Sequence, residues 1–114
     1  MTPARGEAWF ANLDPTRGTE QAGFRPVIVF QTDEVSEFTN TLLCIPLTTN
    51  LRRASLPTCL LIRQGEAGLT SDSVALCHQL RALDKTRLQR RLGTLSPETL
   101  LALESRMIFT MGIL

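Results

Sequence analysis

Residues 18–30, which read Gly-Thr-Glu-Gln-Ala-Gly-Phe-Arg-Pro-Val-Ile-Val-Phe, join a polar loop to an apolar run. Two glycines five residues apart give the loop backbone freedom at both ends. Pro26 fixes its own φ and favours an extended Arg25, so the loop changes to strand abruptly. The run 27–30 is short, rich in β-branched residues and uniformly apolar, which predicts a strand buried on both faces. Arg25 is therefore expected where a polar loop meets a rigid strand, a position suited to holding an anion.

Outward from this stretch, the pattern predicts several short strands and one short helical turn at 33–38. Pro46 lies inside the third of these strands and indicates an edge strand or a bulge. In the fifth expected strand, residues 73–82, alternation places His78 between Leu76 and Leu80 on an apolar face, which favours a partly buried histidine. The six expected strands cover 7–13, 25–31, 41–48, 58–62, 73–82 and 87–95.

The end of the chain predicts a helix that begins after Ser96 and runs to about Met111. Ser96 is typical of an N-cap, and a proline at the first helical position and an acid in the first turn follow it. The apolar stripe of this helix is expected to hold Leu100, Leu103, Met107 and Met111, and Leu101 and Ile108 are expected to widen it.

The chain of 114 residues is expected to form one domain over 1–114, mainly β with a terminal helix, as a small bent antiparallel sheet or barrel. The net charge of +1 gives no global field for polyanions, and one Trp, five Phe and no Tyr disfavour a protein that stacks several bases. Five cations nevertheless crowd into 81–91, which indicates a solvated face or a local phosphate-binding patch.

Three cysteines, Cys44, Cys59 and Cys77, are odd in number and widely spaced. This spacing argues against a disulfide framework and a zinc site, and it favours small core residues in a reducing cytosol. No run approaches the roughly 18 apolar residues of a membrane span, so a cytoplasmic protein without a membrane partner is expected. The motifs of nucleotide and metal sites are also missing, which predicts no metal and no cofactor.

Cleavage of RNA without a metal requires a base for the 2′-hydroxyl, stabilisation of the phosphorane and an acid for the 5′-oxygen. The sequence offers one histidine, His78, so another arrangement would be needed. Arg25 could clamp the phosphate, with Thr48 or Thr49 as a hydroxyl and Glu20 as a loop carboxylate. The residues alone permit this chemistry without indicating it.

Several blocks together resemble the MazF/PemK/Kid toxins of type II toxin–antitoxin systems. The similarity covers nearly the whole chain, and the pairing of the block at 14–26 with the block at 72–84 is highly specific. The similar blocks are 5–9, 12–16, 18–23, 25–27, 46–49, 56–57, 72–76 and 79–84.

This resemblance implies an SH3-like barrel with a C-terminal helix, working as a homodimer. It implies a metal-independent, sequence-specific endoribonuclease that cuts single-stranded RNA, chiefly mRNA, by 2′-hydroxyl attack and so inhibits translation and growth. The products would carry 2′,3′-cyclic phosphate and 5′-hydroxyl ends. A cognate MazE-like antitoxin with an acidic, disordered C-terminal tail would fold along the toxin groove.

The family's motifs also assign residues. Arg25 would stabilise the phosphorane and Thr48 would bind the phosphate, with Glu20 and His78 as candidate catalytic support. The RNA-binding positions expected from the resemblance and from the local cations are Thr16, Arg17, Gly18, Gln21, Thr49, Arg52, Arg53, Leu56, Pro57, Ser73, His78, Gln79 and Arg81.

Two departures from the family pattern bear on mechanism. Several relatives carry an acid where this chain has His78, which could replace it as a base or contact a nucleobase. Some relatives use an arginine as an acid at the position of Leu76, which cannot donate a proton. Two other functions remain open: a CcdB-like toxin that poisons gyrase through a tail such as 111–114, and a non-catalytic SH3-like binding module.

Overall fold

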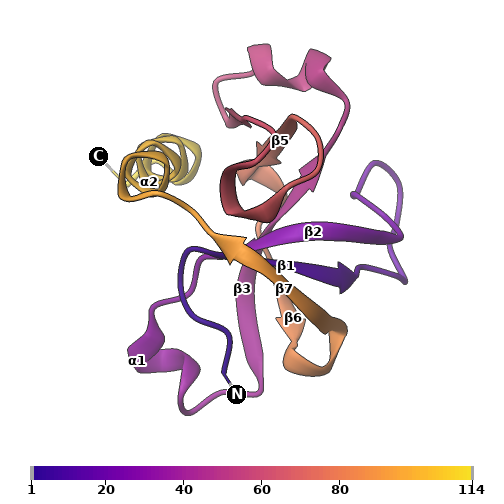
Figure 1. The fold of residues 1–114 in the computed structure, drawn as a ribbon, viewed down its shortest axis with the longest axis vertical. Helices are drawn as coiled ribbons and strands as arrows, with labels where there is room; N and C mark the ends of the chain where they lie inside the picture. Colours follow the sequence, from indigo (N-terminus) through magenta and orange to yellow (C-terminus); the bar gives the residue numbers. More distant parts are fainter. Residues whose placement is uncertain (1, 114) are drawn as a thin grey trace.

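The computed structural model describes residues 2–113. Met1 and Leu114 belong to the expected domain 1–114 but lie outside this range. Leu114 is also the last residue of the tail 111–114 considered above. Within this range the fold is mainly β, with one long helix at its end (Figure 1). The strands are β1 Glu7–Asn12, β2 Phe24–Val29, β3 Thr41–Thr48, β4 Cys59–Ile62, β5 Ser73–Leu76, β6 Arg81–Asp84 and β7 Leu88–Thr94. The helices are α1 Asp33–Ser36 and α2 Pro97–Met111, and short 3-10 turns are η1 Leu51–Ser55, η2 Glu66–Gly68, η3 Cys77–Gln79 and η4 Lys85–Arg87.

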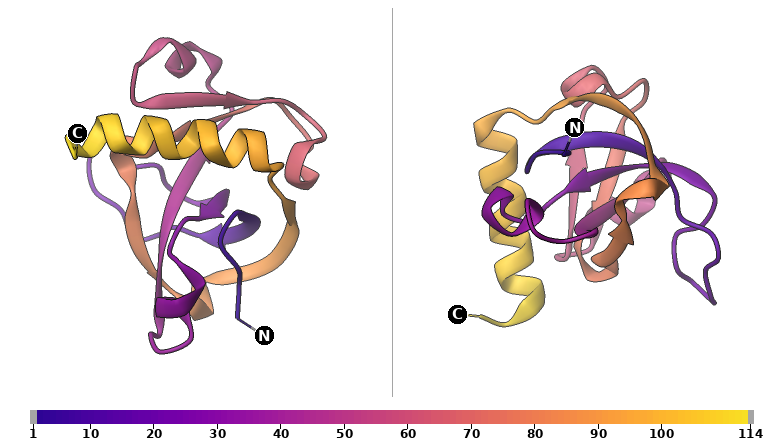
Figure 2. Two further views of the ribbon diagram at one scale, coloured as in Figure 1. Left: turned by 90° about the vertical axis from the view of Figure 1, so that its left-hand side faces the viewer. Right: turned by 90° about the horizontal axis from the view of Figure 1, so that it is seen from below.

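All strand pairs are antiparallel and belong to one strongly bent sheet. The strand order is β4-β5-β3-β2-β1-β7, and β6 pairs with β3 beside this path. Helix α2 lies across one side of the sheet, as the left view of Figure 2 shows. The predicted small antiparallel barrel with a C-terminal helix is confirmed, and so is the helical turn expected at 33–38.

Strand β3 is an interior strand, so of the two alternatives predicted from Pro46, an edge strand or a bulge, the edge strand is wrong. On one side β3 pairs with β2, where Val27 lies opposite Pro46. On the other side its first half pairs with β6 and its last two residues pair with β5. Neither β5 nor β6 pairs with Pro46, which lies in the gap between these two partners. A residue without an N–H is tolerated there because no strand on that side pairs with it, so no backbone hydrogen bond is lost.

The single strand predicted at 73–82 is also wrong beyond Leu76. Thr48 pairs with Val74, and the same register would place His78 opposite Cys44. Arg81 takes that place instead, three residues later, and the three extra residues form the turn η3. The alternation of faces stops at this turn, so His78 is exposed rather than partly buried on an apolar face.

Helix α2 begins and ends as expected but buries a narrower face. The Ser96 hydroxyl accepts a hydrogen bond from the Thr99 N–H, at 3.2 Å, and Gly112 ends the helix in the left-handed region. Leu103 and Met107 are buried against the sheet, with Leu100 partly covered. Because the sheet covers only one side of the helix, three residues expected in the stripe are exposed: Leu101, Ile108 and Met111.

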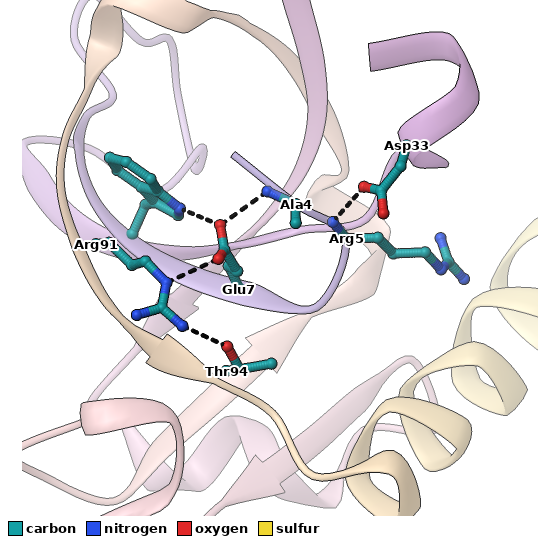
Figure 3. A network of polar contacts seen from close by, with 7 residues as sticks. Ala4, Arg5, Glu7, Asp33, Arg91 and Thr94 are labelled. Atoms are coloured by element: carbon teal, nitrogen blue, oxygen red, sulfur yellow. Dashed lines mark hydrogen bonds and ion pairs between the residues drawn. The ribbon is translucent and has the colours of Figure 1, made fainter. Parts of the chain in front are cut away.

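The Glu7 carboxylate joins the N-terminal segment to β1 and β7 (Figure 3). Its Oε1 accepts hydrogen bonds from the Ala4 N–H at 2.8 Å and from the Trp9 indole N–H at 3.0 Å. Its Oε2 lies 2.7 Å from Nε of Arg91, which also donates to the Thr94 hydroxyl. Partial burial opposes ionisation, but these donors and the Arg91 charge outweigh it and hold the pKa of Glu7 below its ordinary value of 4.5.

We expect Glu7→Gln to lower the free energy of unfolding by about 1–2 kcal/mol at pH 7, because the carboxylate loses charged hydrogen bonds. A lowered native pKa stabilises the fold above the unfolded pKa, and that stabilisation is lost as pH falls through the native value. The difference between variant and wild type in urea unfolding should therefore shrink below pH 4.5. Glu34→Gln, at an exposed residue of α1, is the control, and a pH-independent difference for Glu7→Gln would contradict the assignment.

Candidate active site

One cavity of about 210 Å³ opens where β1, β2 and the end of β3 meet the loop after η2 and β7. Four of the predicted site residues line it: Arg25, Thr48, Thr49 and Ser73. The other lining residues were not predicted from the sequence: Phe10, Pro26, Leu47, Gly68, Leu69, Thr70, Ser71, Arg90 and Leu92.

Arg25 reaches the cavity from the start of β2, just after the loop closes. At the base of the loop the Leu13 N–H donates to the Gly23 carbonyl at 2.9 Å, and the Gly23 N–H donates to Oδ1 of Asp14 at 3.1 Å. Gly23 has a φ of +78°, which a glycine adopts without strain. Nε of Arg25 donates to the Ala22 carbonyl at 3.1 Å, and its terminal nitrogens have no hydrogen-bond partner within residues 2–113. The loop thus orients the guanidinium and leaves its fork free for a ligand.

Thr48 contributes a nearly buried hydroxyl at the end of β3, with 9% of the residue exposed. Its Oγ1 accepts a hydrogen bond from the Asn50 N–H at 3.1 Å. A hydroxyl that accepts in this way keeps its own proton to donate, so Thr48 can donate into the cavity. Ser73 is also buried and donates to the Ser71 carbonyl at 3.0 Å, which directs its proton away from a ligand.

The charge of this cavity is one-sided. Two arginines line it, Arg25 and Arg90, together with five hydroxyl-bearing residues. No aspartate or glutamate of the described chain is among its lining residues. Arginine forks and hydroxyl donors without a competing carboxylate are what an oxyanion such as a phosphate group requires.

Backbone alone forms one part of the wall. A Cβ on Gly68 would lie 2.0 Å from the Leu92 carbonyl oxygen, and one on Gly93 would lie 2.6 Å from the Ala67 carbonyl carbon. The turn η2 and strand β7 therefore touch backbone to backbone at this point. This contact fixes the loop that carries Thr70 and Ser71 to the cavity.

A second hollow, of about 470 Å³, is lined by half of the other predicted site residues. Glu20 lines it, and its carboxylate accepts a hydrogen bond from the backbone N–H of Arg17 in its own loop. His78 lines it too, with Nδ1 2.8 Å from Oγ1 of Thr58. The remaining lining residues are Thr19, Gln21, Arg53, Gln79, Leu80 and Arg81. Glu20 and His78 are thus separated from the cavity that Arg25 and Thr48 share.

Gln79 ties the loop between β1 and β2 to the body of the protein. Its Oε1 accepts a hydrogen bond from the Gln21 N–H at 2.6 Å, and its Nε2 donates to the Thr19 carbonyl at 3.2 Å. The Gln21 side chain in turn donates to the Leu47 carbonyl at 3.3 Å. Residues 19–21 are held in this way between the second hollow and the end of β3.

The remaining predicted RNA-binding residues line neither hollow. Thr16, Arg17 and Gly18 lie in the loop between β1 and β2, which projects from the side opposite α2 (Figure 1; right view of Figure 2). The other three are exposed in or directly after η1: Arg52, Leu56 and Pro57.

The basic run 81–91 is mostly structural. Four of its five cations donate to protein oxygens: Arg81, Lys85, Arg87 and Arg91. Arg81 and Arg87 reach backbone carbonyls at the end of β1 and in the residues after it. Arg90 is the exception, since it is exposed and has no hydrogen bond or ion pair in the part of the chain that the structure describes.

The three cysteines are buried free thiols, as predicted. Burial raises the pKa of Cys44 to about 12 and that of Cys77 to about 11, so neither forms a thiolate near neutral pH. Over residues 2–113, no three His, Cys, Asp or Glu side chains are grouped to hold a metal ion. None of the helices in that range combines the length and apolar character needed to cross a membrane.

Residues 4–110 match the family described as the PemK-like, MazF-like toxins of type II toxin–antitoxin systems. The chain belongs to this family. The resemblance seen in the sequence is confirmed, and so is the fold that it implied.

Several family members can be compared directly. The chain is 33% identical over 109 residues to endoribonuclease MazF of Staphylococcus epidermidis, which covers 96% of this chain and 91% of that protein. The crystal structure of MazF from Deinococcus radiodurans covers 98% of both chains with a TM-score of 0.84 and 21% identity. A mycobacterial endoribonuclease in complex with its cognate antitoxin covers 98% of this chain and 97% of its own, with a TM-score of 0.81 and 20% identity.

We expect Gln79→Ala to release the loop without unfolding the domain, because both of its amide contacts go to residues 19–21. Hydrogen exchange at the Gln21 amide should accelerate by about tenfold, while the free energy of global unfolding changes by less than about 1 kcal/mol. His78→Ala is the matched control, since the His78 ring bonds to Thr58 and not to the loop. Equal hydrogen-exchange rates of the Gln21 amide in Gln79→Ala and wild type would show that Gln79 does not hold the loop.

Proposed function

We propose that this toxin-family protein is an endoribonuclease that cleaves single-stranded RNA without a metal ion, at specific sequences in the cytoplasm. Attack of a 2′-hydroxyl on the adjacent phosphorus would form a 2′,3′-cyclic phosphate and release the 5′-oxygen as a hydroxyl. The name and the identity of the staphylococcal relative support the activity. The observation that carries the proposal is the joint presence of Arg25 and Thr48 in a cavity whose lining residues include no carboxylate.

The reaction places negative charge on the phosphorane oxygens. The free terminal nitrogens of Arg25 are suited to bind two of these oxygens, and the Thr48 hydroxyl can donate to another. Because the guanidinium is already oriented by the Ala22 carbonyl, little reorganisation is needed as the charge develops. Arg25 and Thr48 are therefore the proposed catalytic residues.

The second hollow is proposed to bind bases rather than the reacting phosphate. It carries amide, imidazole and guanidinium groups, which can read the unpaired edges of single-stranded RNA. His78 keeps Nε2 available, since Nδ1 already faces Thr58. Of the two roles considered for His78, a contact to a nucleobase fits this position better than the role of base. Glu20 is proposed to shape the loop over the RNA through its bond to Arg17.

The proposal is tested with a long, unstructured RNA in excess EDTA, with new 5′ ends mapped at single-nucleotide resolution. Wild-type protein should give discrete cuts with 5′-hydroxyl ends. Arg25→Ala should lower kcat about 10²–10³-fold, as removal of a donor to a developing oxyanion does. Arg63→Ala, at an exposed arginine outside both hollows, should cut like wild type. Intact RNA in the presence of folded wild-type protein would overturn the proposal and make gyrase inhibition the next assay.

We further propose a cognate MazE-like antitoxin whose acidic, disordered tail covers the cavity. Related structures are described as a complex of MazE and MazF from Deinococcus radiodurans and as a mycobacterial endoribonuclease with its cognate antitoxin. The two uncompensated guanidinium groups of the cavity are complementary to such a tail.

The remaining apolar face of α2 supports the proposed homodimer. Three large apolar side chains of α2 are exposed, Leu101 at 65%, Phe109 at 62% and Met111 at 57%, and so is Ile113 just after the helix, at 64%. Several large exposed apolar side chains on one element favour an interface there. A second copy of this chain is the proposed occupant.

We expect wild-type protein to sediment as a dimer at micromolar concentration and Phe109→Glu to weaken the dimer at least about 100-fold, because a charge would be buried in the interface. Phe38→Glu is the matched control, since Phe38 is 86% exposed and lies outside α2. A monomeric wild type, or a Phe109→Glu variant that dimerises like Phe38→Glu, would exclude α2 as the interface.

A further inference from the structure

The cavity holds one charged group that the proposed reaction does not use. Arg25 and Thr48 account for the scissile phosphate, whereas Arg90 lines the same cavity from β7 and has no part in that scheme. The cavity lining offers no carboxylate to neutralise it among the described residues. Two cations that face one cavity repel each other, and a bound anion removes that repulsion.

Arg90 also differs from every other cation of its run. Its four neighbours in 81–91 are engaged with carbonyl or carboxylate oxygens, whereas Arg90 is not. All five donors of its guanidinium are therefore available to a ligand. A basic cluster that the sequence leaves undivided thus separates into four structural cations and one free one.

An aromatic pair holds the free guanidinium in place. Cζ of Arg90 lies 5.9 Å from the ring centroid of Phe10, within the range of a cation–π contact. On its other side Phe10 stacks on Phe24, with ring centroids 6.0 Å apart and planes inclined by 20°. The charge of Arg90 is thus held beside the cavity by a ring that leaves its N–H groups unbonded.

Strand pairing places the two arginines on opposite sides of β1. Phe10 pairs with Arg90 on β7 and with Pro26 on β2, and the next residue, Ala11, pairs with Arg25. Neighbouring strands are about 4.8 Å apart, so the two arginine backbones lie about 10 Å apart across β1. Both residues line one cavity, and they contribute to it from different strands, Arg25 from β2 and Arg90 from β7.

We propose that Arg90, positioned by Phe10, binds a second phosphate group of the RNA strand, next to the one that is cleaved. This inference rests on the proposed ribonuclease activity and adds a requirement on the substrate. An RNA with a phosphate beside the scissile one gains a charge-assisted contact, and a dinucleotide with the scissile phosphate alone does not. Arg90 is thus a substrate-binding residue and Phe10 a positioning residue.

The test uses Arg90→Gln, with Arg63→Gln as a control that removes the same charge outside both hollows. Binding is measured with a single-stranded oligonucleotide that carries the mapped cleavage sequence and a 2′-O-methyl group at the cut site. Arg90→Gln should bind about tenfold more weakly at 0.1 M salt, and its log–log salt slope should fall by about 0.7, the value for one contact to single-stranded phosphate. Phe10→Leu keeps the charge and should weaken binding a few-fold with an unchanged slope.

Cleavage of two substrates completes the test. On an RNA with flanking phosphates, Arg90→Gln should raise KM with kcat nearly unchanged, because the contact is equal in ground state and transition state. On a dinucleotide with the scissile phosphate alone, Arg90→Gln should match wild type. If wild type cleaves RNA but Arg90→Gln keeps the slope and KM of Arg63→Gln, the second phosphate site is wrong and the ribonuclease stands. If wild type neither binds nor cleaves RNA, both proposals fall.

Discussion

Strand β3 has to pair its backbone with three other strands, and the positions of the site residues follow from that requirement. One side of β3 pairs with β2 at residues 44–46, and the other side changes from β6 to β5 near Pro46. The change moves the register by three residues, so the chain turns at η3 and brings Gln79 against the loop between β1 and β2. It also leaves Thr48 at the end of β3 beside Arg25 on β2. Pro46, which has no N–H, thus lies where β3 changes its pairing partner, and both hollows lie next to the elements that follow from this change.

The parts that could be predicted from the sequence depend on local signals. Ser96 and Pro97 define the start of α2, and the glycine and proline around Arg25 define the step from loop to strand. The break after Leu76 could not be predicted, because it follows from register against β3 and not from any residue in 73–82. The pairing of Phe10 with Arg90 could not be predicted either, although the sequence placed Arg90 in a candidate phosphate-binding run. They meet because β1 and β7 pair with two irregularities, between Ala8 and Trp9 and between Phe10 and Ala11, and such shifts leave no mark in an apolar pattern.

The family's motifs located residues that composition alone left ambiguous, and the structure then divided them. Arg25, Thr48, Thr49 and Ser73 gather at a cavity of cations and hydroxyl groups, whereas Glu20, Gln79 and His78 gather at a hollow with mixed polar groups. A net charge of +1 hides this division, because it does not show that four of the five cations in 81–91 are hydrogen-bonded to carbonyl or carboxylate oxygens inside the fold. Local partners, and not the count of charged residues, decide which cations are free to bind an anion.

The contact between η2 and β7 limits how the cavity can vary among related proteins. At Gly68 and Gly93 two backbones touch with no room for a Cβ, so this wall cannot be reshaped by exchanging a side chain there. Thr70 and Ser71, carried by the same loop, have side chains at the rim and can be exchanged without moving the backbone. The lining can therefore change at these two positions and at Arg90, whereas Gly68 and Gly93 have no room for a side chain. The backbone contact at the two glycines thus constrains one wall of the cavity, whereas side chains elsewhere in its lining can be exchanged.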